Sequence, residues 1–219
     1  MDIYDNYDEE YIQGLKDFLT FEEGETVLEI AGGRGHYHSF YNKFKIGKYI
    51  AVEPNFEWLE STKSREYDCI TEFNNCIYED YYPTETIDTL ICAGLMYHLP
   101  HPTHFLEVVR NRFKPKTLYL ETVGAYPEKN VHDVLEAHFT PEIVNTYGQR
   151  FDTPSEGIYG NGFNAEYKSV GISLKPSLEF YIYCLSQLGY KLEKYKHISI
   201  DDEEIKSKQD VTMFKYRLG

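Results

Sequence analysis

Apolar residues follow two patterns that alternate along the chain. Short continuous apolar runs, several of them closed by glycine or proline, predict buried strands, and apolar residues three or four positions apart predict helices. The predicted strands are residues 26–30, 49–52, 69–70, 87–92, 118–120, 191–200 and 211–218. The predicted helices cover residues 8–19, 37–44, 56–59, 105–109 and 178–188. Strand and helix therefore alternate over most of the chain.

This alternation predicts a doubly wound α/β fold with a mostly parallel, seven-stranded sheet. Strands that alternate with helices pair in parallel through right-handed crossover connections. The last two predicted strands differ, because only a short acidic segment, residues 201–210, separates them. Since so short a connection suits antiparallel pairing, we expect these two strands to pair antiparallel at the edge of the sheet, which gives the sheet an antiparallel last strand.

One segment, residues 127–175, interrupts the alternation. It follows the fifth predicted strand, its second half is rich in glycine, proline and tyrosine, and it is too long for an ordinary connection. We expect one domain over residues 1–219, with residues 127–175 inserted as a helical and loop-like lid or substrate cap. Two roles are open for Tyr159, Phe163 and Tyr167 in this lid. Their rings either stack on a planar substrate or form a small core for the lid itself.

Composition and charge narrow the classes of function. The 219 residues are 42% hydrophobic and 16% aromatic, which is enough for one buried core. A formal net charge of −14 disfavours nucleic acids, whose phosphates are bound by lysine and arginine. No apolar run approaches the roughly 18 residues of a membrane span. We therefore expect a soluble, cytoplasmic protein without membrane association; its oligomeric state is not predicted.

The stretch "VLEIAGGRGHY", residues 27–37, places glycines directly after the first predicted strand. In a doubly wound sheet, ligands bind beyond the carboxyl ends of the strands, where a bare turn lets them approach the backbone. A dinucleotide site has the pattern G-x-G-x-x-G, whereas His38 stands at the third glycine position here. Glu53 ends the next strand and can accept hydrogen bonds from ribose hydroxyls. Both features favour S-adenosylmethionine, which has no pyrophosphate, over NAD or FAD.

At these residues the chain resembles the Rossmann-like, class I S-adenosylmethionine-dependent methyltransferases. The matching segments are "VLEIAGGRG" (27–35), "AVEP" (51–54), "IDTLICAGLMYHLPHP" (87–102), "LYLET" (118–122) and "PSLEFYIYCLSQLGY" (176–190). Together they span nearly the whole chain outside the predicted lid. The resemblance implies the cofactor S-adenosyl-L-methionine and a methyltransferase activity.

The resemblance also assigns residues to the cofactor. The residues at matching positions are Glu29, Ala31, Gly33, Gly35, Glu53, Asn75, Cys76, Ile77 and Ala93. Among them, Glu53 is expected to bind the ribose, residues 75–77 the adenine and Ala93 the methionine side. The family usually has glycine where Ala31 stands, and the turn tolerates alanine if Ala31 keeps a negative φ.

Within this class, "GLMYH" and "LYLET" resemble segments of the tRNA wobble-uridine carboxymethyltransferases, which use carboxy-S-adenosylmethionine. Those enzymes carry two arginines after the Tyr-His pair, whereas Leu99 and Pro100 follow His98 here. A cofactor carboxylate requires bidentate or paired cations, and Tyr97 is the one matching carboxylate-binding residue. We therefore expect plain methyl transfer.

Three residues are predicted to be catalytic, namely His98, Tyr97 and Glu121. Because an imidazole titrates near neutral pH, His98 is the predicted base, and Tyr97 is expected to orient the acceptor or the cofactor. Glu121 ends the fifth strand and suits proton acceptance or amine binding. The alternative interpretation is that Tyr97 and His98 pack under the lid and Glu121 caps a neighbouring helix.

A metal site is not predicted. His98, His101 and His104 recur at every third position, which at first suggests a cluster of ligands. Pro100 and Pro102 lie between them and prevent one continuous helix from presenting all three.

These observations predict a methyltransferase that acts on a small-molecule acceptor, with the lid providing specificity. Two alternatives remain open. One is a tRNA nucleoside methyl- or carboxymethyltransferase, which predicts a basic face formed by Arg110, Arg112, Lys114, Lys116 and the lysines of residues 191–196. The other is a catalytically silent cofactor-binding partner subunit.

We predict that Glu53→Ala weakens binding of S-adenosylmethionine about tenfold or more, because hydrogen bonds to a charged group are lost. Calorimetric titration of both proteins measures the difference. Unchanged affinity would contradict the placement of the ribose on Glu53.

Overall fold

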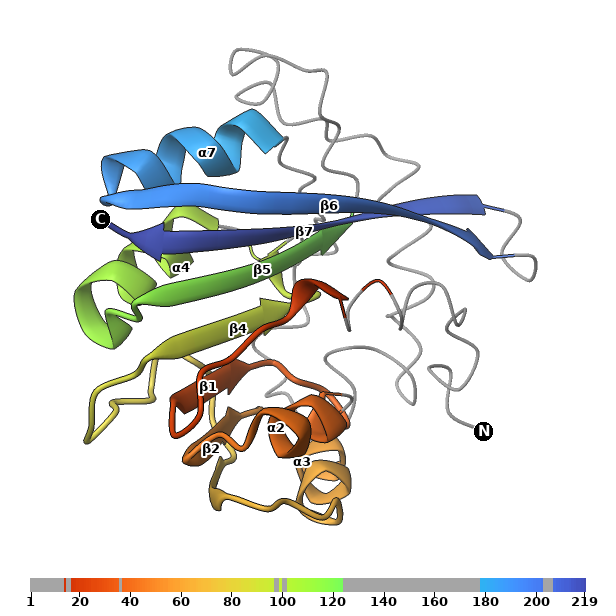
Figure 1. Cartoon of the computed structure of the whole chain (residues 1–219), viewed down its shortest axis with the longest axis vertical. Helices are drawn as coiled ribbons and strands as arrows, with labels where there is room; N and C mark the ends of the chain where they lie inside the picture. Colours follow the sequence, from red (N-terminus) through yellow and green to blue (C-terminus); the bar gives the residue numbers. More distant parts are fainter. Residues whose placement is uncertain are drawn as a thin grey trace.

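The computed structural model describes residues 14, 17–35, 37–96, 99, 102–123, 178–202 and 207–219. Its sheet has seven strands in the order β3-β2-β1-β4-β5-β7-β6 (Figure 1). The strands are β1 Thr26–Ile30, β2 Lys48–Val52, β3 Ile70–Asn74, β4 Thr89–Ala93, β5 Thr117–Val123, β6 Tyr190–Asp202 and β7 Ser207–Leu218. The helices are α2 His38–Phe44, α3 Phe56–Lys63, α4 Pro102–Val108, the π-helical turn Val109–Phe113 and α7 Leu178–Gln187.

The strand pairings confirm the predicted fold class. Strands β1 to β5 pair in parallel, with β1 between β2 and β4. β7 pairs antiparallel with both β5 and β6, so the last two strands form the predicted antiparallel pair. The predicted first helix, residues 8–19, and the predicted lid, residues 127–175, lie largely or wholly outside the described residues.

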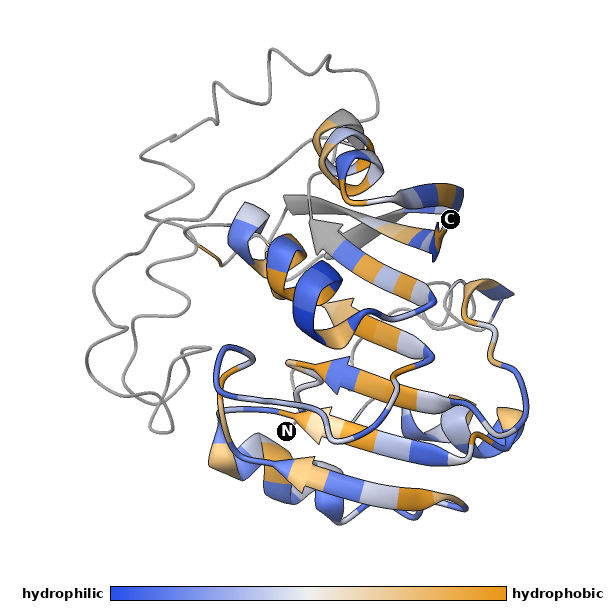
Figure 2. Ribbon diagram, turned by 90° about the vertical axis from the view of Figure 1, so that its left-hand side faces the viewer, coloured by the Kyte–Doolittle hydropathy of each residue, from blue (hydrophilic) through white to orange (hydrophobic). Residues whose placement is uncertain are grey.

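Helices cover both faces of the sheet, and each face has its own core. On one face, α4 and α7 pack against the inner strands through residues such as Phe105 and Tyr181. On the other face, α2 and α3 contribute Tyr41 and Leu59 to a second cluster. Hydrophobic residues run along the inner strands between these layers (Figure 2). This burial explains why the inner strands read as continuous apolar runs. None of the helices in the described ranges is both long and apolar enough to cross a membrane.

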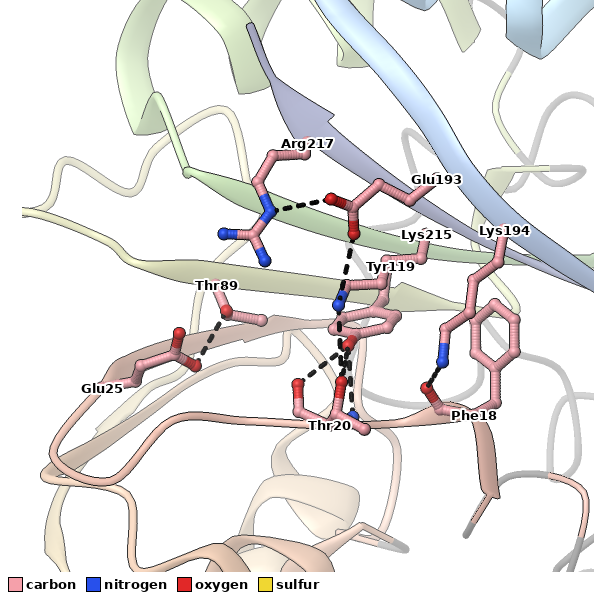
Figure 3. Close-up of polar contacts among 9 residues, drawn as sticks. All are labelled: Phe18, Thr20, Glu25, Thr89, Tyr119, Glu193, Lys194, Lys215 and Arg217. Carbon is pink, nitrogen blue, oxygen red and sulfur yellow. Dashed lines mark hydrogen bonds and ion pairs between the residues drawn. The ribbon is translucent and has the colours of Figure 1, made fainter.

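The chain before β1 is tied to the antiparallel end of the sheet (Figure 3). Tyr119 on β5 donates a hydrogen bond to the carbonyl of Thr20 at 2.8 Å and accepts one from the Thr20 N–H at 3.2 Å. Lys194 on β6 donates to the carbonyl of Phe18 at 2.7 Å, and its ammonium lies 4.5 Å from the centre of the Phe18 ring. These contacts join segments that are about a hundred or more residues apart and lead the chain into β1.

Ala31 does not keep the negative φ under which the turn was expected to tolerate alanine. Ala31 has a φ of 56°, in the left-handed region. Its N–H donates to the carbonyl of Val52 at 2.9 Å, which extends the pairing of β1 with β2 by one residue before the chain turns away from the sheet. The turn therefore imposes the conformation that glycine usually provides at this position, and alanine adopts it at a steric cost.

We predict that Ala31→Gly stabilises the protein slightly, by no more than about 1.5 kcal/mol. Relief of the left-handed conformation contributes about 1–2 kcal/mol, and the larger entropy of glycine in the unfolded chain offsets about 0.5–1 kcal/mol of it. Urea denaturation measures the net change.

Ala51→Gly is the matched control, because Ala51 is buried in the neighbouring strand β2. This variant should be less stable than the wild type. If Ala31→Gly destabilises as much as Ala51→Gly, the strain at Ala31 is refuted.

Candidate active site

Predicted site residues from four strands gather at the carboxyl edge of the parallel sheet. The turn after β1, Glu53 after β2, Ala93 at the end of β4 and Glu121 on β5 all lie at this edge, because the four strands run in the same direction (Figure 1). Ala93 and Glu121 lie opposite each other in register. Parallel pairing thus brings together segments that are far apart in the sequence.

The three glycines of the turn lack side chains for three different reasons. A Cβ at Gly32 would lie 2.4 Å from Cδ of Glu29, so a buried side chain occupies that space. A Cβ at Gly35 would lie 3.1 Å from Cγ2 of Thr62, so Gly35 permits close packing against α3. A Cβ at Gly33 would meet no atom within 4 Å, so here the φ of 59°, in the left-handed region, is what favours glycine. Of the three, Gly33 is the one that leaves room for a ligand; contact between Gly35 and a cofactor stays a prediction.

Glu53 is 3% exposed at the end of β2, and both of its carboxylate oxygens are anchored to backbone. Oε1 accepts a hydrogen bond from the N–H of Asn55 at 2.8 Å, and Oε2 accepts one from the N–H of Gly33 at 3.1 Å. An ionised carboxylate has about four acceptor positions, so each oxygen retains capacity for a further donor. Burial raises the pKa of Glu53 to about 7, and the two backbone hydrogen bonds oppose this rise.

Glu29 on β1 is fully buried beneath the turn, within a cluster of tyrosines. The Tyr49 hydroxyl donates to Oε2 of Glu29 at 2.5 Å. The Tyr49 ring stacks between those of Tyr41 and Tyr67, at centroid distances of 4.7 and 5.0 Å. Burial raises the pKa of Glu29 to about 7, and the hydrogen bond from Tyr49 opposes this rise. The structure thus shows the Glu29 side chain packed against Gly32. A direct contact between Glu29 and the cofactor stays a prediction.

Glu121 lies on β5 at the carboxyl edge of the sheet, and its place on the acceptor side of the site stays a prediction. It is 8% exposed, and its Oε2 accepts a hydrogen bond from the Tyr37 hydroxyl at 3.3 Å. Tyr37 is the N-cap residue of α2, so Glu121 contacts the start of that helix through the tyrosine hydroxyl. The contact links the end of the glycine turn to β5, and the sequence offers no signal for it.

The segment after β3, where the adenine is expected, is held by groups from two sides. Asn75 donates through its side-chain amide to the backbone carbonyl of Glu53 at 3.0 Å. Arg112, from the π-helical turn, donates to the carbonyls of Tyr78 and Glu79 at 3.3 and 2.5 Å. Cys76 and Ile77, between these anchors, are partly buried. Arg112 belongs to the basic run Arg110, Arg112, Lys114 and Lys116, which by itself indicates the solvated end of a helix. The sequence therefore does not reveal this inward contact.

Several predicted site residues lie outside the described part of the chain. They are Tyr97, His98, Tyr159, Phe163 and Tyr167. Their roles in catalysis and substrate binding therefore stay predictions.

Comparison with known proteins establishes the family. Residues 4–151 match the model of a methyltransferase domain family, which is more than half of the chain. The chain belongs to this family of S-adenosylmethionine-dependent methyltransferases, in agreement with the resemblance of its motifs. No curated protein matches the sequence.

Solved structures confirm the fold. A methyltransferase of unassigned specificity from Bacillus halodurans has 15% sequence identity and a TM-score of 0.63, covering 94% of this chain and 97% of its own. A cyclopropane synthase from Mycobacterium tuberculosis has 13% identity and a TM-score of 0.63, covering 97% and 86%. A methyltransferase from Thiobacillus denitrificans, solved with S-adenosylhomocysteine, has 13% identity and a TM-score of 0.62, covering 97% and 92%. At such low identities these structures establish the fold alone.

We predict that affinity for S-adenosylhomocysteine falls about tenfold between pH 8 and pH 6. A carboxyl group with a pKa of about 7 changes from about nine-tenths ionised to about one-tenth ionised over this interval, and its neutral form is a poorer acceptor for ribose hydroxyls. Binding of S-adenosylhomocysteine is therefore strong above pH 7 and weakens as the pH falls below 7 and Glu53 takes up a proton. Calorimetric titration at several pH values measures the dependence.

The Glu53→Gln variant is the control, because it has no carboxyl group to titrate at this position. Its affinity should be lower at pH 8 and should change much less with pH, and any change that remains belongs to other groups. Equal pH dependence in both proteins contradicts the assignment to Glu53.

Proposed function

We propose that this methyltransferase transfers the methyl group of S-adenosylmethionine to a small-molecule acceptor, with the cofactor ribose bound by Glu53. One observation carries the placement of the cofactor. The buried carboxylate of Glu53 retains acceptor capacity on both oxygens, next to the open space above Gly33. Two acceptor positions match the two hydroxyls of a ribose, so the residues present fit this cofactor.

Each part of the site has a role in this proposal. Bound S-adenosylmethionine would supply a methyl group on its sulfonium sulfur; the acceptor nucleophile would attack the methyl carbon in line with the carbon–sulfur bond, and S-adenosylhomocysteine would leave as the neutral thioether. Gly33 allows the cofactor to approach the turn, the segment 75–77 flanks the adenine, and Ala93 lines the methionine side. Glu121 faces the acceptor and binds an amine or takes up its proton, with Tyr37 fixing the orientation of the carboxylate. His98 and Tyr97 are the further residues that we assign to this side.

The charges near the sheet support a small acceptor over a nucleic acid. Of the basic face that RNA binding would require, three members already have partners within the protein. Arg112 donates to the carbonyls of residues 78 and 79, Lys116 pairs with Asp88 at 2.7 Å, and Lys194 donates to Phe18. Cations engaged in this way are less available to neutralise phosphates, on which nucleic-acid affinity depends.

Parallel titrations with S-adenosylmethionine, S-adenosylhomocysteine, carboxy-S-adenosylmethionine and NAD test the cofactor. We expect the first two to bind, and carboxy-S-adenosylmethionine and NAD to bind more weakly or not at all. Preference for the carboxylated donor would replace plain methyl transfer by carboxymethyl transfer. Salt-dependent binding of bulk tRNA would favour a nucleic-acid acceptor, and cofactor affinity without turnover on any acceptor would favour a silent subunit.

We predict that Glu121→Gln lowers turnover about 100-fold or more, within the range typical of a lost general base. Release of S-adenosylhomocysteine from a panel of small amines, phenols and carboxylic acids provides the measurement, with the wild type defining the active acceptor. Affinity for S-adenosylhomocysteine should stay within about twofold, because Glu121 lies on the acceptor side. Full turnover by the variant would remove Glu121 from the catalytic set.

A further inference from the structure

The peptide groups on both sides of Gly33 are held by side chains. Its N–H donates to Oε2 of Glu53 at 3.1 Å, and its carbonyl accepts a hydrogen bond from Oγ1 of Thr62 at 3.0 Å. The N–H belongs to the peptide plane before the Cα atom and the carbonyl to the plane after it. The two hydrogen bonds therefore restrain φ and ψ of Gly33, the two torsions that connect these planes.

Gly33 needs such restraint more than other residues do. Its φ is 59°, and glycine has more accessible backbone conformations than any other residue. A turn of this kind is mobile unless contacts hold it, and each ligand that binds a mobile turn must order it. Glu53, as the proposed ribose acceptor, holds one side of Gly33, and Thr62 holds the other.

Thr62 reaches the turn from the last helical turn of α3. The side chain is 2% exposed, and its hydroxyl also lies 3.1 Å from the carbonyl of Trp58, four residues earlier in the helix. A threonine in a helix commonly bonds to that carbonyl alone. Here the hydroxyl lies between the helix and a turn 29 positions away in the sequence. Arg65 makes a second contact to this turn, because its Nε donates a hydrogen bond to the carbonyl of Arg34 at 3.4 Å.

We propose that Thr62 is a positioning residue for the cofactor, whose hydroxyl holds the glycine turn in its binding conformation before the cofactor arrives. The inference rests on the proposed function, because it assumes that S-adenosylmethionine binds over Gly33. Thr62 acts through Gly33, so it sets the affinity for the cofactor and has no part in the transfer step.

Replacement by valine tests the hydroxyl without changing the shape of the side chain. We expect Thr62→Val to weaken binding of S-adenosylhomocysteine about tenfold, the scale of ordering the backbone of one residue. Thr62→Ser keeps the hydroxyl and should restore the affinity to within about threefold of the wild type. Calorimetric titration of each purified protein gives the dissociation constants.

Thr89→Val is the matched control for general destabilisation. Thr89 is 1% exposed, and its hydroxyl makes one hydrogen bond to Glu25, at the opposite end of the strands (Figure 3). Thermal denaturation should show that both valine variants lose stability, whereas cofactor affinity should fall in Thr62→Val alone.

The outcomes separate the two proposals. If the wild type binds neither S-adenosylmethionine nor S-adenosylhomocysteine, the proposed function fails, and this inference fails with it. If the wild type binds and Thr62→Val binds equally well, the positioning role alone is refuted. If Thr62→Ser, which keeps the hydroxyl, binds as weakly as Thr62→Val, the hydroxyl does not hold the turn in its binding conformation, which also refutes the positioning role.

Discussion

The hydrogen bonds that Glu53 accepts from Gly33 and Asn55 are the interaction on which the site depends. They join the turn after β1, the end of β2 and the start of α3 through one buried carboxylate. Thr62, near the end of α3, donates to the same turn, so this helix of eight residues is linked to Gly33 directly through Thr62 and indirectly through Glu53 at its start. The arrangement uses protein groups to hold a ligand-binding backbone, which reduces the entropy that binding must overcome.

The site is rich in buried carboxyl groups. Glu29, Glu53 and Glu121 are all buried at or near the carboxyl edge of the sheet, and hydroxyl or backbone N–H groups stabilise each of them. A buried carboxylate attracts a cation strongly, because the surroundings screen charge poorly. This distribution favours a positively charged sulfonium donor and disfavours a donor that carries an additional carboxylate.

Several features were predictable because local patterns encode them directly. The range of β1 agrees with the apolar run at residues 26–30, and the antiparallel pairing of β6 with β7 follows from their short connection. The left-handed conformation of Ala31 was not predictable, because the hydrogen bond that continues the pairing of β1 with β2 outweighs the intrinsic backbone preference of alanine. The inward contact of Arg112 was not predictable, because the sequence does not show that a π-helical turn carries this side chain to the carbonyls of residues 78 and 79.

The sequence by itself determined the α/β class, the order in which strands and helices follow one another along the chain, the glycine turn and the acid at position 53. It could do so because hydrophobic periodicity and bare turns are local properties. Tertiary structure alone decided what each glycine faces and which distant side chains support the turn. The hydroxyls of Thr62, Tyr49 and Tyr37 contact their partners across 20 to 84 positions. Such contacts depend on the packing of helices against the sheet, and periodicity does not specify them.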